Sequence, residues 1–303
     1  MILLNYYNDE QDLDLLVRIG EMYYAQGKTQ KEISEALGLS RSGVSRLLQA
    51  ARDQGIVQIT VKNPSERLQK LGEGLRQIFG LDECRVCPSE PDEAGQLRLA
   101  YQAAELLLAC LKPGDILGLG LSTAVHKMVE LLPNSSEYAC LKIVPISGGM
   151  GVARGPHINY TVQLAAQKLH ADYVSLNVPL FIDEPTIAAR LLEEESIKQC
   201  TSLWHQLSCA VVGIGVSSDN AVPDGLRVPV LHPQARTAAA VCGWFFGEQG
   251  QLIEGKSTTS ISVEQLQKTP AVMAVAGGRH KASAILSVLR AGFITHLVTD
   301  EDV

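Results

Sequence analysis

The chain has 303 residues, of which 46% are hydrophobic and 19% charged, and this is enough for about two folded domains. No apolar run approaches the roughly 20 residues that span a bilayer, and the first 20 residues are acidic where a secretory signal is positively charged. Because the seven scattered cysteines are also typical of reduced thiols, the composition excludes secreted, membrane and fibrous proteins and predicts a cytoplasmic one.

The formal net charge of −7 is unevenly distributed along the chain. Residues 1–26 carry −4, residues 27–62 carry +3, and the remainder carries −6. A short basic segment in an acidic chain favours a small DNA-binding module, because contacts to phosphates supply most of the non-specific affinity. Charge alone leaves a solvated charged surface as the alternative.

Residues 29–51 have the pattern of a helix-turn-helix. Thr29 and Glu32 fit a capping box at the start of a short helix, and Gly38 supplies the turn that ends it. Ser40 can cap the second helix. Four residues of that helix recur at the spacing of a buried stripe: Val44, Leu47, Leu48 and Ala51. An ordinary helical hairpin is the alternative to a DNA-binding pair.

The opposite face of the second helix carries guanidinium, hydroxyl and amide groups. Such groups bind base edges and phosphates in the major groove of DNA. We therefore predict DNA contacts from Thr29, Gln30, Ser40, Arg41, Ser42, Ser45, Arg46 and Gln49. A helix over residues 13–24 would support the pair, and residues 55–61 alternate like a strand that could form a winged edge.

A further helix is expected between Pro64 and Gly80. Its apolar stripe consists of Leu68, Leu71, Leu75, Ile78 and Phe79. Packing between two domains and a dimerisation seam both explain the stripe, and a helix-turn-helix protein needs a two-fold dimer to bind two half-sites. We therefore expect a homo-oligomer, either a dimer or a tetramer. The expected segments are a DNA-binding domain (1–63), a linker or oligomerisation helix (64–82) and a larger domain (83–303).

From Cys84 onward, strand and helix patterns alternate. Short apolar runs predict strands over residues 116–121, 141–146, 174–178, 210–214, 272–276 and 296–299. Longer stretches with a 3.6-residue period predict helices over residues 97–111, 123–132, 158–169, 185–207 and 281–289. This alternation indicates an α/β fold with a mostly parallel sheet covered on both faces. Ligands of such sheets bind at the carboxyl ends of the strands.

Three strand-to-helix junctions are rich in glycine, over residues 118–123, 147–151 and 276–281. The first leads through Ser122 and Thr123 into a helix, and the last places Arg279, His280 and Lys281 at the start of one. Helix starts favour anions, so cations placed there oppose the helix dipole and need a functional reason. The junctions predict a phosphate or carboxylate site, with plain strand-to-helix geometry as the alternative.

Taken together, these motifs resemble the SorC family of bacterial sugar-responsive transcription regulators. The resemblance covers residues 13–303. It is carried, in order, by residues 29–48, 55–57, 114–116, 144–149, 212–215, 277–281 and 297–300. Each motif is weak alone, and their order and spacing together are specific.

The resemblance implies a C-terminal domain similar to sugar-phosphate isomerases that senses an effector, commonly a phosphorylated sugar. It also implies tetramers that bind operators of sugar-catabolic genes. Carried over by position, Ser122, Thr123 and Lys281 would hold the phosphate, and Asp183 and Glu184 would approach the sugar hydroxyls. With the residues of the glycine-rich junctions, the predicted effector set is Gly120, Ser122, Thr123, Gly148, Gly149, Asp183, Glu184, Gly277, Arg279 and Lys281.

The chain departs from the family pattern around residues 239–247. Ala239 and Ala240 stand where the family usually has Gly-Asp, and Gly247 stands where it has a further Asp. A carboxylate expected to bind sugar hydroxyls is therefore missing, while the residues for the phosphate end remain.

Two other functions are weighed against a regulator. The C-terminal domain could isomerise or deaminate a sugar phosphate, but Asp183 and Glu184 are the only candidates for a general base. Residues 250–257 match the phosphate-binding loop formula, but extended chain is expected after them where that loop needs a helix. Cys84 and Cys87 lack a second ligand pair. We expect no enzyme activity, metal or cofactor.

Overall fold

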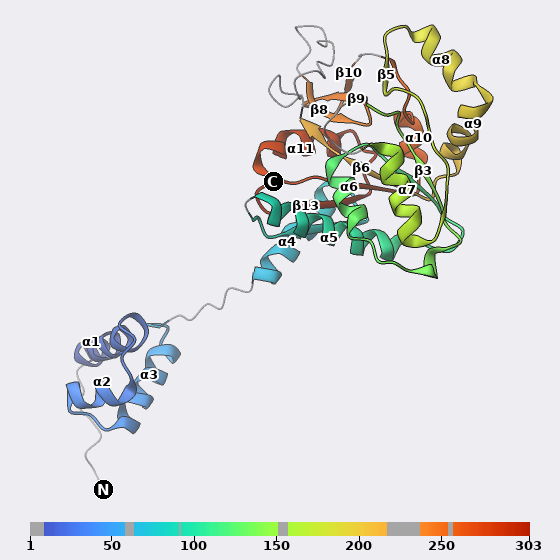
Figure 1. The fold of residues 1–303 in the computed structure, drawn as a ribbon. Coiled ribbons are helices and arrows are strands. Elements are labelled where there is room, and N and C mark those ends of the chain that lie inside the picture. The colour runs from blue at the N-terminus through green and yellow to red at the C-terminus, as the bar shows by residue number, and fades with distance from the viewer. Residues whose placement is uncertain (1–8, 58–63, 91, 151–156, 217–236, 254–256) are drawn as a thin grey trace. The chain divides into compact units, whose positions relative to one another are not determined.

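The computed structural model describes residues 9–57, 64–90, 92–150, 157–216, 237–253 and 257–303. Its contacts divide the chain into two units, Met1–Asn63 and Pro64–Val303, each of which is described by itself (Figure 1). Among the described residues, no helix combines the length and the apolar composition that crossing a bilayer requires.

The N-terminal unit contains the predicted helix-turn-helix. Helix α1 (Asp9–Gly20) continues as a π-helical turn, η1 (Glu21–Ala25), and is followed by α2 (Gln30–Leu37) and α3 (Arg41–Asp53). Gly38 ends α2 with a φ of 65°, a conformation that glycine adopts without strain. The core of the unit is formed by Ile19, Met22, Ile33, Val44 and Leu48. The predicted winged strand falls largely on residues 58–61, which lie outside the described residues.

The two predicted helix caps are confirmed. The Thr29 side chain accepts a hydrogen bond from the Glu32 amide, and the Thr29 amide donates to the Glu32 carboxylate at 2.8 Å. The Ser40 hydroxyl accepts from the Gly43 amide at 3.0 Å. Each cap satisfies amides that have no partner inside their own helix, which fixes where α2 and α3 begin.

The C-terminal unit is built around a seven-stranded sheet, confirming the predicted α/β class. The strand order is β1 (Glu83–Cys87), β13 (His296–Asp300), β12 (Ala271–Val275), β6 (Cys209–Gly213), β2 (Ile116–Leu119), β3 (Lys142–Pro145) and β4 (Asp172–Tyr173). Every pairing within this sheet is parallel. All of its strands therefore end at the same edge.

Helices cover both faces of the sheet (Figure 1). One face packs on α5 (Asp92–Cys110), α6 (Thr123–Glu130) and α7 (Ile158–Leu169), and the other packs on α4 (Pro64–Phe79), α9 (Glu195–Thr201) and α11 (Ala282–Arg290). Successive strand residues alternate between the two cores, so that Val211 contacts the first and Val212 the second. Helix α4, expected as a linker, packs against β1 and is part of this unit.

Two small antiparallel sheets accompany the main sheet. One has the order β10 (Leu252–Ile253), β9 (Trp244–Gly247), β8 (Thr237–Val241) and β7 (Gly215–Val216), and the other pairs β5 (Phe181–Ile182) with β11 (Ser257–Thr258). The β8–β9 hairpin was not predicted. Its two-residue turn has positive φ at both Cys242 (49°) and Gly243 (82°), as a type I′ turn requires.

Several segments differ from the sequence predictions, beginning with β1, which was not among the predicted strands. No strand forms over residues 174–178, all of which the structure describes: β4 ends before them, at Tyr173, and the Asn159 side chain binds both backbone groups of Leu176 at 2.9 and 3.0 Å. The single helix expected over 185–207 is broken by the extended Glu194 into α8 (Pro185–Glu193), α9 and the 3₁₀ turn η3 (Ser202–Gln206). A capped helix that was not predicted, α10 (Val263–Lys268), precedes β12.

The packing of Gly213 gives a stability test. A methyl group on Gly213 would overlap the Ser122 side chain, which caps α6. We expect Gly213→Ala to lower the free energy of unfolding by about 1–3 kcal/mol, measured by urea denaturation. Gly74→Ala is the control, because nothing lies within 4 Å of its added Cβ in α4. This control should stabilise the protein by about 0.5–1 kcal/mol, and equal losses in both variants would contradict the prediction.

The capping box of α2 gives a pH-dependent test. Hydrogen bonds from the amide and then the hydroxyl of Thr29 lower the pKa of Glu32 below its usual 4.5. A carboxyl whose pKa is lower in the folded state stabilises that state above its ordinary pKa and loses the effect as pH falls. Thr29→Ala should speed amide exchange in α2 several-fold at neutral pH, and the difference should shrink below about pH 4. Thr29→Ser should behave like the wild type.

Candidate functional site

The predicted DNA-binding face lies on α3. Val44, Leu48 and Ala51 are buried on one side of the helix. The side chains exposed on the other side are Arg41, Ser42, Ser45, Arg46 and Gln49. The predicted two-faced character of this helix is confirmed, and the exposed groups are those that bind phosphates and base edges. Their contacts with DNA remain a prediction.

Several groups of this face already have partners within the unit. The Arg46 Nε donates to the Ser42 carbonyl at 3.3 Å, and the Gln49 amide donates to Asp53 at 2.8 Å. The hydroxyls of Thr29 and Ser40 serve as helix caps, and Gln30 is half-buried. Within the described residues, Arg41 and Arg46 are therefore exposed cations of this face that form no ion pair and cap no helix.

The predicted effector residues lie at the carboxyl edge of the main sheet. Gly120 follows β2, Gly148 follows β3, and Gly277 follows β12. Strand β6 separates β2 from β12. Two inter-strand spacings of about 4.8 Å put the ends of β2 and β12 about 10 Å apart. The topology thus brings the three glycine-rich junctions to one edge, as parallel strands require.

The first two junctions use their glycines to pack against the chain itself. The Gly120 amide donates to the Val211 carbonyl at 2.8 Å, and a Cβ on Gly120 would lie 2.9 Å from the Cys242 sulfur. The amides of Gly148 and Gly149 donate to the carbonyls of Thr259 and Val178 at 3.1 and 2.8 Å. These amides are engaged inside the protein, so they do not supply donors for an anion.

The start of α6 is different. Ser122 caps the helix by accepting from the Ala124 amide at 3.2 Å, and Thr123 is exposed. Within the described residues, the amides of Ser122 and Thr123 have no hydrogen-bond partner. Two unpartnered amides at the start of a helix are the donors that an anion needs. In the first junction, the two residues predicted to hold phosphate are therefore the ones whose amides have no partner within the described residues.

The third junction presents the cations. Arg279, His280 and Lys281 form a 3₁₀ turn, η4 (Arg279–Lys281), directly before α11. Arg279 is exposed and Lys281 is half-buried. Burial lowers the pKa of Lys281 below its usual 10.5, because the charged ammonium is less well solvated there. A bound anion would offset this cost.

Asp183 and Glu184 are exposed and follow β5. Glu184 accepts a hydrogen bond from the Thr186 hydroxyl at 3.0 Å. Strand β5 is tied to the edge through Leu180, whose amide donates to the Gly149 carbonyl at 2.6 Å. Ala240, for which the resemblance implies an acid in other members, pairs with Gly215 of β7 just beyond the end of β6. No carboxylate is contributed from that position.

Three residues outside the predicted set shape the edge. The buried Ser147 hydroxyl accepts from the Leu121 amide at 3.2 Å, and Thr259 donates to the Pro179 carbonyl at 2.5 Å. Asp300, at the end of β13, accepts from the Gly278 amide at 2.5 Å. The sequence signal for Asp300 was its position directly after the strand predicted over 296–299, as the last residue of the segment 297–300 that carries the resemblance.

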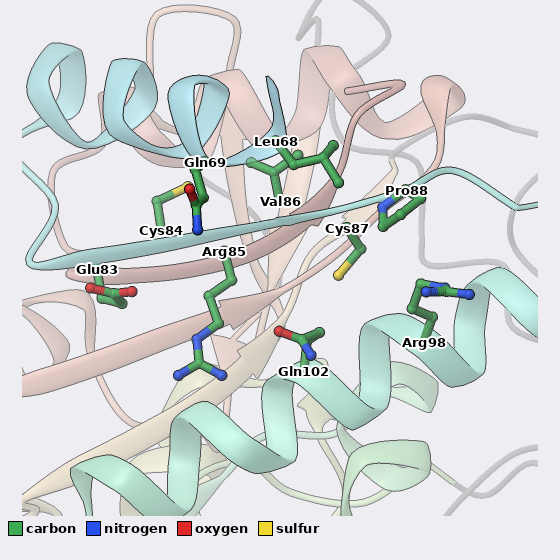
Figure 2. Close-up of a pocket in the computed structure, with 10 residues that line it drawn as sticks. All are labelled: Leu68, Gln69, Glu83, Cys84, Arg85, Val86, Cys87, Pro88, Arg98 and Gln102. Carbon is green, nitrogen blue, oxygen red and sulfur yellow. The ribbon is translucent and has the colours of Figure 1, made fainter. Parts of the chain in front are cut away.

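Two cavities of the unit lie away from the predicted effector residues. One of about 460 Å³ runs along β1 between α4 and α5, and a second of about 250 Å³ lies between α4 and α11. Figure 2 shows the first, with Gln69 reaching from α4 and Arg85 and Gln102 on the side of α5. Neither cavity is lined by a residue of the predicted effector set.

The comparisons with known proteins agree with this architecture. Residues 63–303 match the family model described as "Putative sugar-binding domain", and residues 19–67 match the MarR family. The chain is 31% identical to the sorbitol operon regulator of Klebsiella pneumoniae over 97% of this chain and 97% of that protein. It is 28% identical to the transcriptional regulator LsrR of Escherichia coli K12, covering 95% of this chain and 92% of that protein.

The crystal structure of the full-length sorbitol operon regulator SorC from Klebsiella pneumoniae has a TM-score of 0.71 with this chain at 32% identity. That match covers 96% of this chain and 97% of the other. These relatives are regulators and not enzymes, so the isomerase or deaminase alternative is not supported. A family match over the C-terminal unit and a relative this similar over nearly the full length show that the chain belongs to the SorC family of sugar-binding transcriptional regulators.

Proposed function

We propose that this protein is a transcriptional regulator that binds operator DNA through α3 and is controlled by a phosphorylated sugar bound in the C-terminal unit. Its genes would serve carbohydrate catabolism, and it would act in the cytoplasm as a homo-oligomer, a dimer or a tetramer. The observation that carries the proposal is the exposed face of α3, where Arg41 and Arg46 project from a helix whose other side is buried.

The phosphate is proposed to bind between α6 and α11. The unpartnered amides of Ser122 and Thr123 would donate to it, and Lys281 would supply positive charge. Arg279 is exposed beside Lys281 and would add a second cation. Gly120, Gly148, Gly149 and Gly277 would support the backbone around this site rather than donate to the ligand.

The sugar end of the effector is proposed to differ from that of typical family members. Asp183 and Glu184 are exposed carboxylates beside the carboxyl edge of the main sheet and would contact hydroxyl groups, while Ala240 is an apolar position. A site with a polar group that binds a ligand hydroxyl discriminates strongly against ligands that lack this hydroxyl. Ala240 has no polar group, so this position does not select for a hydroxyl. We therefore propose an effector with fewer hydroxyls to satisfy at that end, or with a different substituent there.

Arg46→Ala tests the DNA-binding face. Removing a guanidinium that reads a base should weaken binding to the preferred sequence by about 1–3 kcal/mol and relax the preference at one base position. The measurement is fluorescence anisotropy with DNA from upstream of the gene, or with DNA found by site selection. Lys31→Ala is the control, because it removes one positive charge from α2. It should weaken binding to all DNA sequences to the same extent, and by less than Arg46→Ala weakens binding to the preferred sequence. Equal effects of the two variants would argue against base readout by α3.

Lys281→Ala tests the effector site. Each of sorbitol 6-phosphate, fructose 6-phosphate, glucose 6-phosphate, ribose 5-phosphate and inorganic phosphate is titrated calorimetrically into the full-length protein. The wild type should bind at least one sugar phosphate, and Lys281→Ala should bind it at least about tenfold more weakly. Lys268→Ala, an exposed lysine on α10, should bind as the wild type does. Unchanged affinity in Lys281→Ala would remove this residue from the site.

The same titration has a defined pH dependence. Burial lowers the pKa of Lys281 from its usual 10.5, so affinity for a phosphate ester should fall as pH rises, and the fall should begin at a lower pH than an ordinary lysine would give. The fall should be absent in Lys281→Ala, whose remaining affinity has no lysine to titrate. A wild type without this fall would contradict the proposed contact.

A further inference from the structure

The end of β13 contacts two functionally different parts of the C-terminal unit. One is residues 277–281, called the basic loop below. The other is α4, the helix that begins at Pro64, directly after the last residue of the N-terminal unit. The contacts are made by two neighbouring residues, Asp300 and Glu301, which are called the clasp below.

Asp300 holds the basic loop. Its Oδ2 accepts from the Gly278 amide at 2.5 Å, and its Oδ1 accepts from the Asp302 amide at 3.1 Å. A Cβ on Gly277 would overlap the Asp300 carboxylate, so a glycine is needed where the loop passes it. Gly278 has a φ of 97°, which side chains other than hydrogen rarely allow. The carboxylate and the two glycines thus fit together as one unit.

This hydrogen bond also fixes the position of Lys281. The Gly278 carbonyl accepts from the Lys281 amide at 2.8 Å and closes the η4 turn. Both backbone groups of Gly278 are therefore engaged, the amide by Asp300 and the carbonyl by Lys281. Any change in the Gly278 peptide moves the lysine proposed to hold the phosphate.

Glu301 holds α4. Its carboxylate lies 2.9 Å from the Arg67 guanidinium, and it accepts from the Ser89 amide at 3.3 Å. Its own amide donates to the Cys87 carbonyl at 3.0 Å, which extends the pairing of β13 with β1. Among the ion pairs of the described residues, Lys70 with Glu66 is internal to α4, whereas Arg67 with Glu301 ties α4 to the sheet.

We propose that Asp300 is a positioning residue of the effector site and that Glu301, through Arg67, transmits the state of the basic loop to α4. A ligand that draws Lys281 toward its phosphate shifts the Gly278 peptide, then Asp300, and then the contact of Glu301 with α4, the helix that follows the N-terminal unit in the sequence. Coupling of this kind needs a contiguous set of contacts with two arrangements. The proposal rests on the proposed function, because it supplies the regulation of the same site.

The first experiment compares Arg67→Gln with Lys70→Gln in the full-length protein. Both variants remove one exposed cation from an ion pair of α4, and only the first separates α4 from the clasp. The quantity measured is the ratio of DNA dissociation constants with and without the most effective sugar phosphate of the panel above. Losing one partly exposed ion pair should reduce this ratio by about two- to fivefold in Arg67→Gln. The ratio should be unchanged in Lys70→Gln and restored in Arg67→Lys.

Ligand affinity separates coupling from binding. In the absence of DNA, Arg67→Gln should bind the sugar phosphate within about twofold of the wild type, because Arg67 is not a ligand contact. Asp300→Asn should bind it about tenfold more weakly, since one of the two accepting oxygens of Asp300 becomes an NH2 group, which faces a backbone amide and cannot accept from it. DNA affinity without ligand and the thermal unfolding midpoint show whether Asp300→Asn remains folded.

Each result decides a separate question. Equal ratios in Arg67→Gln and the wild type overturn the transmission through Glu301, and wild-type ligand affinity in Asp300→Asn overturns its positioning role. If Asp300→Asn fails to fold, faster amide exchange at Gly278 and Lys281 in the milder Asp300→Glu supports the role, and unchanged exchange overturns it. A wild type that binds DNA but responds to no sugar phosphate overturns the effector half of the proposed function and the coupling with it.

Discussion

The common direction of its strands is the constraint on which the C-terminal unit depends. Because every pairing in the main sheet is parallel, residues far apart in the sequence end at one edge. That edge collects the loops after β2, β3 and β12 and the carboxylate at the end of β13. The Cys242–Gly243 turn packs there as well, against Gly120 and Leu180. The candidate effector site and the clasp both follow from this alignment.

Hydrogen bonding then decides which parts of the edge can bind a ligand. Buried amides must have partners, and at Gly120, Gly148, Gly149 and Gly278 those partners belong to the chain. Glycine-rich junctions are therefore a weaker sign of an anion site than the sequence suggests, because two of the four, Gly120 and Gly148, pack closely against other parts of the protein. Within the described residues of this edge, the groups left for an anion are the amides of Ser122 and Thr123 and the cations before α11.

The sequence was sufficient where structure is local. The caps Thr29 and Ser40, the turn at Gly38 and the two faces of α3 depend on residues a few positions apart, and all are confirmed. It was insufficient where a distant group decides. Asn159 replaces a strand partner at Leu176, and Asp300 bonds to an amide 22 residues earlier in the chain. Such pairs leave no local periodicity in the sequence. The absence of a strand over 174–178 and the contact of Asp300 with Gly278 therefore appear only in the fold.

Lys281 shows how the fold and the proposed effector depend on each other. Lys281 is the N-cap residue of α11, where the helix dipole disfavours a cation, and burial lowers its pKa. Both effects make the charged side chain unfavourable in the protein alone. A phosphate bound between Lys281 and the amides of Ser122 and Thr123 would remove both, because its negative charge faces the dipole and the ammonium together. A ligand that binds only the folded state stabilises that state. Because the anion would relieve the unfavourable free energy of placing the Lys281 charge there, that relief would contribute to the affinity for the anion.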